Sequence, residues 1–298
     1  MTIWVTTFSL IVIIKLNIWR GEYMGILMAG LSPHPPIIIP KIGGERREKA
    51  QDTINSLTEI SQEIKKKNPD LIITISPHGP VFRDAISVLD ERKPEGDFDD
   101  FGHPEISFKV KNDLEFIENL KKNSFQNNID LITLSDARSS GYNSTSSKLD
   151  HGVLVPLYFL REAGVRTPIV PLTMGLLDYY NLFEFGQMIQ KTVKEMGYDV
   201  VIIASGDLSH RLKPGAPAGY NPRGEEFDKE LINLLDEKKF EGVLNIDQSL
   251  IKKAGECGLR PIIIMLGCLK DMKINTEVKS YEGPYGVGYG VVGFYPEG

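Results

Sequence analysis

Four of the five histidines lie in short motifs beside apolar segments. His34 lies in LSPHPP, His78 in ISPHGP, His151 in LDHGV and His210 in ASGDLSH. Neutral imidazole binds transition metals and also moves protons near neutral pH, so such a group suits a metal centre with an acid–base partner. The alternative is that each histidine caps or packs locally. We prefer that interpretation for His103, because no buried strand precedes its FGHPE motif.

A metal centre of this kind also needs a third ligand. Two histidines and one carboxylate with open positions suit non-haem Fe(II) and O₂ chemistry, and zinc with a bound water uses a similar set. Glu256 in KKAGECGLRP and Glu282 in SYEGPYG both lie in glycine-containing turns, and the residues alone do not choose between them. A solvated surface carboxylate is the alternative for either. Asp207 is close enough to His210 in sequence to orient it.

Strands alternating with helices must position these side chains. Residues 70–76 and 199–205 are apolar almost throughout, which is typical of strands buried on both faces. The pattern predicts a single α/β domain with a central, mainly parallel or mixed sheet flanked by helices. Ligands in such sheets bind beyond the carboxyl ends of strands, where the motifs of His34, His78 and His210 fall. His151 lies at the expected start of a helix, so all four histidines could face one edge of the sheet.

Two polar segments interrupt the alternation. Residues 90–104 are rich in Asp, Gly and Pro, and residues 136–148 are rich in Ser, Thr, Gly and Asn. We expect both to be irregular loops that cover a substrate, with Tyr142 as a candidate ring contact.

Composition excludes several classes of protein. Lys and Arg total 34 against 40 Asp and Glu, a net charge of −6, so a nucleic-acid binder is not expected. The two cysteines, Cys257 and Cys268, are too few for a disulfide framework or a cysteine-rich metal site, which favours a cytoplasmic protein.

The first 23 residues differ from the rest of the chain. Their apolar run, Phe8 to Ile14, is too short to span a membrane, and a weak anchor is the competing interpretation. We interpret residues 1–23 as an upstream extension outside the fold, and residues 24–298 as the domain, which we do not expect to contact a membrane.

The ordered motifs SPHPP, SPHGP, LDHGVLVPL, SGDLSH and AGECGLRP resemble those of the LigB-like class III extradiol ring-cleaving dioxygenases, from about Met24 to the C-terminus. The sequence is most similar to the AmmeMemoRadiSam system dioxygenase-like branch, related to Memo-type proteins. The resemblance implies a LigB-like fold that cleaves a small aromatic diol with O₂. It is also compatible with a homo-oligomer and with association with an AmmeMemoRadiSam-type partner domain or a radical-SAM protein.

The resemblance also implies roles for individual residues. His34, His78 and Glu256 would hold Fe(II), with Zn, Cu or Mn as alternative metals. His210 would be the catalytic acid–base, and His151 would lie next to the substrate and oxygen.

One position departs from the dioxygenase pattern. Cys257 follows Glu256, and Memo-type proteins have a cysteine at about this point, where a thiolate would favour a softer metal such as copper or zinc. Two alternatives to the dioxygenase therefore stay open: a non-catalytic Memo-like metal-binding protein, and a zinc-dependent hydrolase that uses the same ligands. Asp150 and Asp207 would lie behind the ligands.

Overall fold

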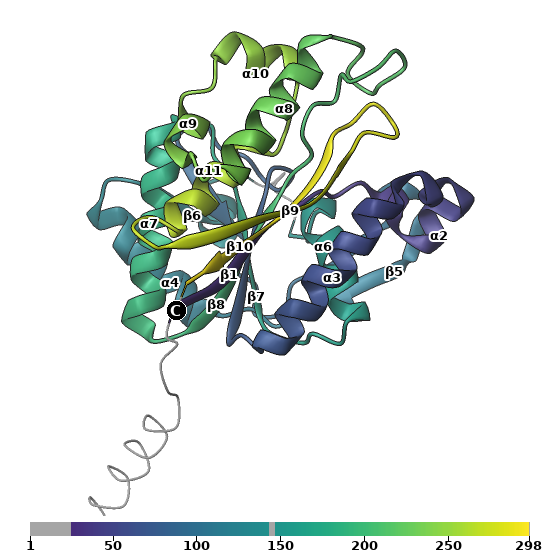
Figure 1. Ribbon diagram of the computed structural model, residues 1–298. Helices are drawn as coiled ribbons and strands as arrows, with labels where there is room; N and C mark the ends of the chain where they lie inside the picture. The colour runs from purple at the N-terminus through teal and green to yellow at the C-terminus, as the bar shows by residue number, and fades with distance from the viewer. Residues whose placement is uncertain (1–24, 143–146, 298) are drawn as a thin grey trace, which may run out of the picture.

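An eight-stranded mixed sheet forms the centre of the molecule (Figure 1). The structure is a computed structural model that describes residues 25–142 and 147–297, so the predicted extension at residues 1–23 lies outside the described residues. The sheet order is β6-β3-β7-β2-β8-β1-β10-β9. The strands are β1 (Gly25–Ser32), β2 (Leu71–Ser76), β3 (Ala85–Val88), β6 (Asp130–Thr133), β7 (Ile169–Thr173), β8 (Asp199–Ser205), β9 (Ile274–Glu282) and β10 (Tyr289–Pro296). The predicted α/β fold with a mixed sheet is confirmed.

Four adjacent strands, β7, β2, β8 and β1, run parallel to one another. Ala204 of β8 pairs with both Ile75 of β2 and Leu31 of β1, so these three strands are level with one another. Their carboxyl ends therefore open at the same height on the same edge of the sheet. β10 and β9 continue the sheet antiparallel beyond β1.

Alternate side chains of the central strands enter two separate cores. In β2, Leu71, Ile73 and Ile75 belong to one core, and Ile72 belongs to the other. This is the period-two pattern of a strand covered on both faces.

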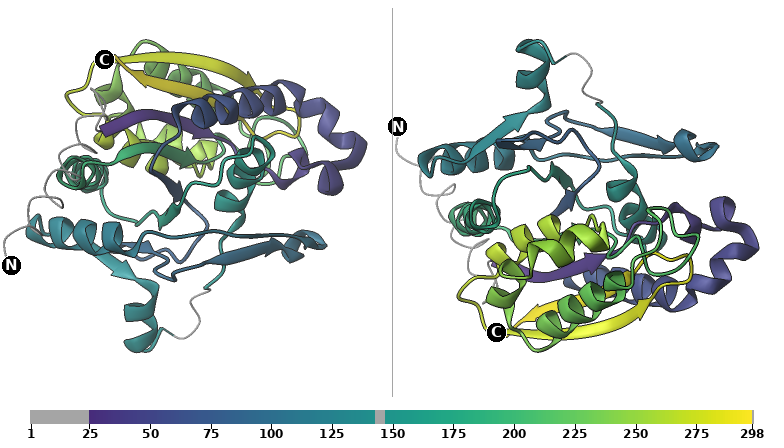
Figure 2. Two further views of the ribbon diagram at one scale, coloured as in Figure 1. Left: turned by 90° about the horizontal axis from the view of Figure 1, so that it is seen from below. Right: turned by 90° about the horizontal axis from the view of Figure 1, so that it is seen from above.

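Helices cover both faces of the sheet (Figure 2). The second core is covered by α3 (Gln51–Lys67) and α6 (His151–Glu162). The first core is covered by α4 (Leu114–Gln126), α7 (Tyr179–Met196), α8 (Arg223–Asp236), α9 (Phe240–Leu244), α10 (Gln248–Ala254) and α11 (Leu259–Cys268). Within residues 25–142 and 147–297, none of the helices has the length and apolar character needed to cross a membrane.

The segment predicted as an irregular loop over residues 90–104 is instead largely a hairpin. It contains β4 (Glu95–Phe98) and the turn η3 (Asp99–Phe101), and β5 (His103–Lys109) begins at its end. Phe98 is fully buried, and Gly96 passes so close to Leu149 that an added Cβ would lie 2.5 Å from its carbonyl oxygen. One buried aromatic anchor and one close backbone approach fix this polar segment despite its loop-like composition.

The second predicted loop is helical at its start. Helix α5 (Leu134–Ser139) begins where the Thr133 hydroxyl accepts a hydrogen bond from the backbone N–H of Asp136. The other short elements lie after β1: η1 (Pro36–Ile38), α2 (Pro40–Gly43) and η2 (Gly44–Ala50).

A buried carboxyl group joins α8 to the C-terminal hairpin and to the segment that follows β8. Asp228 accepts hydrogen bonds from the backbone N–H of Ser209 and from the Tyr281 hydroxyl, both at 2.8 Å. Gly288 leaves the room for it, since an added Cβ there would lie 2.0 Å from the Asp228 carboxyl. Burial raises the pKa of Asp228 from 3.8 to about 7.

We expect Asp228→Asn to change how stability depends on pH. The wild-type carboxyl ionises near pH 3.8 when unfolded but near 7 when folded, so its contribution to folding is lost as the pH rises through this window. Asparagine cannot ionise, so the variant should gain up to about 4 kcal/mol relative to wild type between pH 4 and 7. Thermal unfolding across this range measures the difference.

Asp236→Asn is the matched control, because Asp236 is exposed at the end of the same helix. Its Tm difference from wild type should stay flat over the same range. A flat Tm difference for the Asp228 variant as well would contradict the assignment of a raised pKa to this carboxyl.

Candidate functional site

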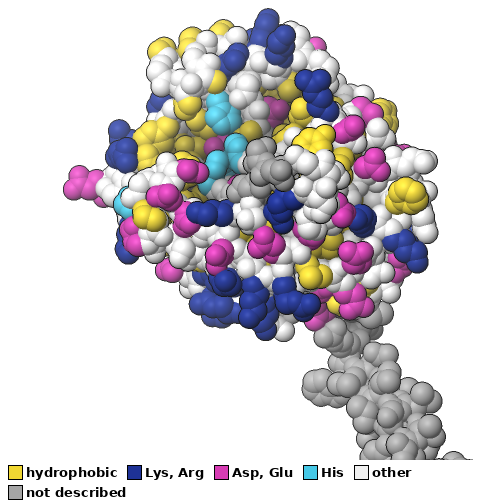
Figure 3. Space-filling view, turned by 180° about the vertical axis from the view of Figure 1, so that it is seen from behind, with side chains coloured by type: hydrophobic (Ala, Val, Ile, Leu, Met, Phe, Trp, Pro, Cys, Tyr) yellow, Lys and Arg dark blue, Asp and Glu magenta, His cyan; other side chains and the backbone are white. Residues whose placement is uncertain are grey.

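Three histidines meet beyond the carboxyl ends of the parallel strands. His34 follows β1, His78 follows β2, and His151 begins α6. Their ring centroids are 4.2 to 5.2 Å apart, and one ring nitrogen from each lies within 4.8 Å of the others. The space-filling view shows histidine side chains gathered in a hollow of one face, bordered by hydrophobic and acidic side chains (Figure 3). The group could hold a metal ion.

Hydrogen bonds fix the tautomer of His34, the most buried of the three. The Ser205 hydroxyl has one proton, and it donates this proton to the carbonyl oxygen of Gly152 at 2.5 Å. Ser205 Oγ lies 2.9 Å from His34 Nδ1, and it must therefore accept the proton of this second hydrogen bond. His34 carries its proton on Nδ1, and its Nε2 presents a free lone pair to the centre of the group.

That lone pair faces His78. The two Nε2 atoms are 2.9 Å apart, so in the metal-free protein His78 donates the proton of this hydrogen bond. Burial is the largest cause that lowers the pKa of His34, and loss of hydration also lowers the pKa of His78. Burial lowers the pKa of His151 to about 4. The three rings are therefore neutral at pH 7, which is the form that binds metals.

Asp150 connects the start of α6, where His151 lies, to the end of β2, which precedes His78. Its carboxylate caps α6 by accepting from the Gly152 N–H at 2.8 Å, and it also accepts from the Ser76 hydroxyl at 2.5 Å. A Cβ at Gly152 would lie 2.3 Å from Ser76 Oγ, so glycine is required for this close approach. The cap therefore fixes the start of α6, and with it the position of His151, against β2.

Asp207 and Cys257 approach His34 from the other side. Asp207 Oδ1 accepts from the backbone N–H of His34 at 3.0 Å, and its own N–H donates to Cys257 Sγ at 3.3 Å. The sulfur lies 3.7 Å from His34 Nε2. Burial raises the pKa of the Cys257 thiol well above its usual value, so without a cation nearby it is protonated. The segment after β8 and the segment before α11 pack closely here, because a Cβ at Gly206 would lie 2.2 Å from the Cα of Gly258.

The two glutamates singled out in the sequence do not join the three-histidine group among the described residues. Glu256 Oε2 accepts from the Leu259 N–H at 2.6 Å, at the start of α11, and burial raises its pKa to about 7. Its role as a ligand stays a prediction. Glu282 accepts from the N–H and hydroxyl of Thr53 and so ties β9 to α3.

The remaining two histidines occupy different surroundings. His210 lies in the segment after β8, close enough that a charge on it would lower the pKa values of His34 and His78. Burial lowers the pKa of His210 itself. His103 lies on β5 and pairs with Glu105 at 3.1 Å, outside the three-histidine group.

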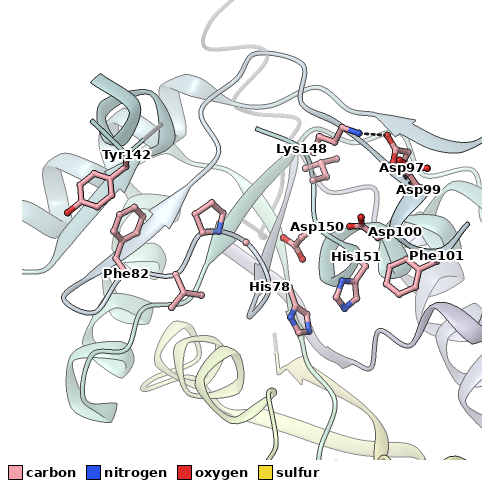
Figure 4. A pocket seen from close by; sticks show the side chains of 14 residues that line it. His78, Phe82, Asp97, Asp99, Asp100, Phe101, Tyr142, Lys148, Asp150 and His151 are labelled. Atoms are coloured by element: carbon pink, nitrogen blue, oxygen red, sulfur yellow. Dashed lines mark hydrogen bonds and ion pairs between the residues drawn. The ribbon is translucent and has the colours of Figure 1, made fainter. Parts of the chain in front are cut away.

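A cavity of about 770 Å³ opens onto His78 and His151 (Figure 4). Phe82 and Tyr142 form one wall, with ring centroids 5.7 Å apart in an edge-to-face arrangement. Phe101 stands on the opposite side, 5.3 Å from the His151 ring. Also on that side are Asp97, Asp99, Asp100 and Lys148.

Apart from Tyr142, these wall residues were not identified from the sequence. Most of them belong to the β4–β5 hairpin, in a segment that its composition assigns to a loop. The run DFDDFGH, with aromatic residues between acids, is the available signal.

The family comparison covers most of the chain. Residues 28–292 match the family described as the catalytic LigB subunit of aromatic ring-opening dioxygenase. A Clostridium acetobutylicum protein is 41% identical over 262 residues, which are 88% of this chain and 56% of that protein. A MEMO1 family protein of Methanocaldococcus jannaschii is 26% identical over 73% of this chain and 66% of its own length. The chain thus spans less than two thirds of either relative.

Two further comparisons cover nearly the whole length of the other protein. The 3,4-dihydroxyphenylacetate 2,3-dioxygenase of Escherichia coli is 24% identical, covering 87% of this chain and 95% of the enzyme. The crystal structure of an uncharacterized Escherichia coli K12 protein superposes with a TM-score of 0.58 at 14% identity, over 90% of this chain and 99% of the other. That likeness shows the fold alone.

We expect Ser205→Ala to weaken metal binding about tenfold, because His34 would lose the acceptor that holds its proton on Nδ1. Titration of the purified chain with Zn²⁺ against a chromophoric chelator measures the affinity, and ¹⁵N chemical shifts of the imidazoles report the tautomer.

Ser124→Ala is the matched control, since Ser124 is also buried and donates to a carbonyl, that of Leu120, in α4. It should leave both readouts unchanged. Unaltered Zn²⁺ affinity and an unaltered His34 tautomer in the Ser205 variant would contradict the proton assignment.

Proposed function

The chain belongs to the family of the catalytic LigB subunit of aromatic ring-opening dioxygenase, and from that premise we propose that it is an Fe(II)-dependent enzyme that opens catechol-type rings with O₂. The observation that carries the proposal is the group of His34, His78 and His151, of which His78 and His151 line a cavity of about 770 Å³. A cavity of this size admits an aromatic ring with a short substituent.

The donor atoms fit a divalent transition metal. His34 Nε2 offers a lone pair, His78 Nε2 lies 2.9 Å from it, and all three rings are neutral at pH 7. We assign His34 and His78 as ligands, with His151 as the third because it completes the observed group. Glu256 stays the alternative third ligand, although its Oε2 accepts from the Leu259 N–H and it is not part of the observed group. Fe(II), when bound, supplies open positions at which a diol and O₂ come together.

The chain's own residues bind the ring and manage the proton. Phe82 and Tyr142 on one side of the cavity and Phe101 on the other offer ring faces and edges to an aromatic substrate. His210 is neutral at pH 7 because burial lowers its pKa, so it can accept the proton of a substrate hydroxyl and return it later.

The first test is oxygen uptake. The Fe(II)-loaded chain should consume one O₂ for each catechol ring opened, while His210→Phe should keep its iron but lose at least about 100-fold in rate. Iron content is measured beside the oxygen trace. His103→Phe is the control, because that histidine lies on β5 away from the group, and it should keep both properties.

Two outcomes would count against the proposal. An undiminished rate in His210→Phe would remove His210 from the acid–base role. Absence of oxygen uptake with every diol, in protein that holds stoichiometric iron, would contradict the ring-opening activity itself.

A second function is favoured by one contact, the approach of Cys257 Sγ to within 3.7 Å of His34 Nε2. A thiolate at this place would favour copper or zinc over iron. The chain would then be a metal-binding protein without ring-opening activity, a role consistent with its similarity to MEMO1 family proteins.

Cys257→Ala distinguishes the two functions. If the thiolate is a ligand, the variant should bind Zn²⁺ at least about tenfold more weakly and lose the sulfur-to-metal charge-transfer absorption of the Co²⁺-substituted protein. If the three histidines hold the metal, Fe²⁺ content and oxygen uptake should persist. Cys268→Ala is the control, because that thiol is buried in α11 and donates to Ile264.

A further inference from the structure

The cavity that leads to the three histidines carries an excess of negative charge. Of the described residues that line it, four are aspartates, and Lys148 is the sole cation. Lys148 bonds Asp97 at 2.9 Å, so much of its charge is compensated within the wall. The lining contains no arginine among the described residues, although arginine is the side chain best suited to bind a substrate carboxylate.

Two of the four aspartates have other partners: Asp97 pairs with Lys148, and Asp150 accepts from Ser76 and Gly152, which leaves Asp99 and Asp100 without a partner for their side chains among the described residues. Both are exposed in the turn η3, and within the described residues neither side chain makes a hydrogen bond or an ion pair. Lys148 acts on them only at longer range. Nor do these carboxylates come together as a group that could hold a metal ion among the described residues. Their charge is therefore directed at whatever enters the cavity.

The position of this charge relative to the reacting end follows from the hairpin. Asp100 immediately precedes Phe101, whose ring lies 5.3 Å from that of His151. The Asp100 charge reaches the His151 ring and works to raise its pKa against burial. Figure 4 shows Asp99 and Asp100 on the same side of the cavity as His151, opposite Phe82 and Tyr142. A substituent on a ring held at the histidines would therefore lie in a cavity whose wall carries these carboxylates.

We propose that the site selects aromatic diols that carry a cationic substituent, such as an aminoalkyl group, and disfavours those with a carboxylate, with Asp99 and Asp100 as the specificity-determining residues. The inference rests on the proposed function, because it concerns the substrate of that same site. It also separates this chain from the relative named for 3,4-dihydroxyphenylacetate, whose named substrate bears a carboxylate.

Three catechols of similar size and different charge test the proposal. They are 4-(2-aminoethyl)catechol, neutral 4-ethylcatechol and 3,4-dihydroxyphenylacetate. Anaerobic calorimetry on the Fe(II)-loaded chain gives their dissociation constants without any turnover. We expect the amine to bind about tenfold more tightly than the acid at low ionic strength, with the neutral probe between them. The ratio should fall as salt is added, because these carboxylates are exposed.

Asp99→Asn/Asp100→Asn should bring the three dissociation constants to within about twofold of one another. Asp271→Asn is the control, since Asp271 is exposed in the turn that follows α11, and a left-handed backbone there suits asparagine. It should keep the wild-type preference. Thermal unfolding confirms that each variant is folded.

Failure of this proposal and failure of the proposed function give different results. If no catechol is cleaved, the ring-opening function fails, but the charge preference can still be read from binding of tyramine against 4-hydroxyphenylacetate, which lack the diol. Equal or tighter binding of the acids, no binding of either series, or a preference that survives in the double variant would overturn the selection for cations by Asp99 and Asp100.

Discussion

The site depends on a series of hydrogen bonds that runs from helix α6 to the ring of His34. The Gly152 carbonyl accepts the Ser205 proton, Ser205 Oγ accepts the His34 proton, and the Nε2 lone pair is left to face His78. This series forms because β1 and β8 are parallel and in register, with Ser32 opposite Ser205. The same sheet geometry that buries the core thus also sets which nitrogen of a histidine is available for a metal.

The turn before α11 shows how adjacent residues acquire different surroundings. Glu256 points to the backbone N–H of Leu259 at the start of the helix, where the helix dipole favours a negative charge. Cys257 points the other way, toward Asp207 and His34. In a tight turn successive side chains diverge, so only one of two neighbours can face the centre. Gly206 packs closely on Gly258 beside this turn, where an added Cβ would lie 2.2 Å from the Gly258 Cα.

The sequence predicts the positions that follow directly from buried strands. His34 and His78 each come two residues after a strand whose apolar run is continuous, and strand order alone places both at one edge of the sheet. The expected helix start at His151 allows this histidine to face the same edge, but nothing local to it shows that Asp150 bonds Ser76 and so fixes its position. Strand β4 could not be predicted, because the burial of Phe98 and the approach of Gly96 to Leu149 are contacts between distant segments. A polar composition indicates that a segment is exposed, but it does not distinguish an exposed strand from a loop.

The histidines and the acidic wall of the cavity come from different parts of the fold. The histidines follow buried strands or begin a buried helix, whereas most of the acidic residues lie on the β4–β5 hairpin. The histidines are kept neutral by burial and by one another, so they add little charge of their own at pH 7. The wall takes its charge from the β4–β5 hairpin, which buries Phe98 in the second core and accepts from the Leu149 N–H at the Glu95 carbonyl. The cavity therefore presents neutral imidazoles at His78 and His151 and exposed carboxylates on the wall beside them. Salt screens exposed carboxylates but not buried imidazoles. Ionic strength should therefore change the ratio of affinities for cationic and anionic ligands far more than it changes the affinity for the metal.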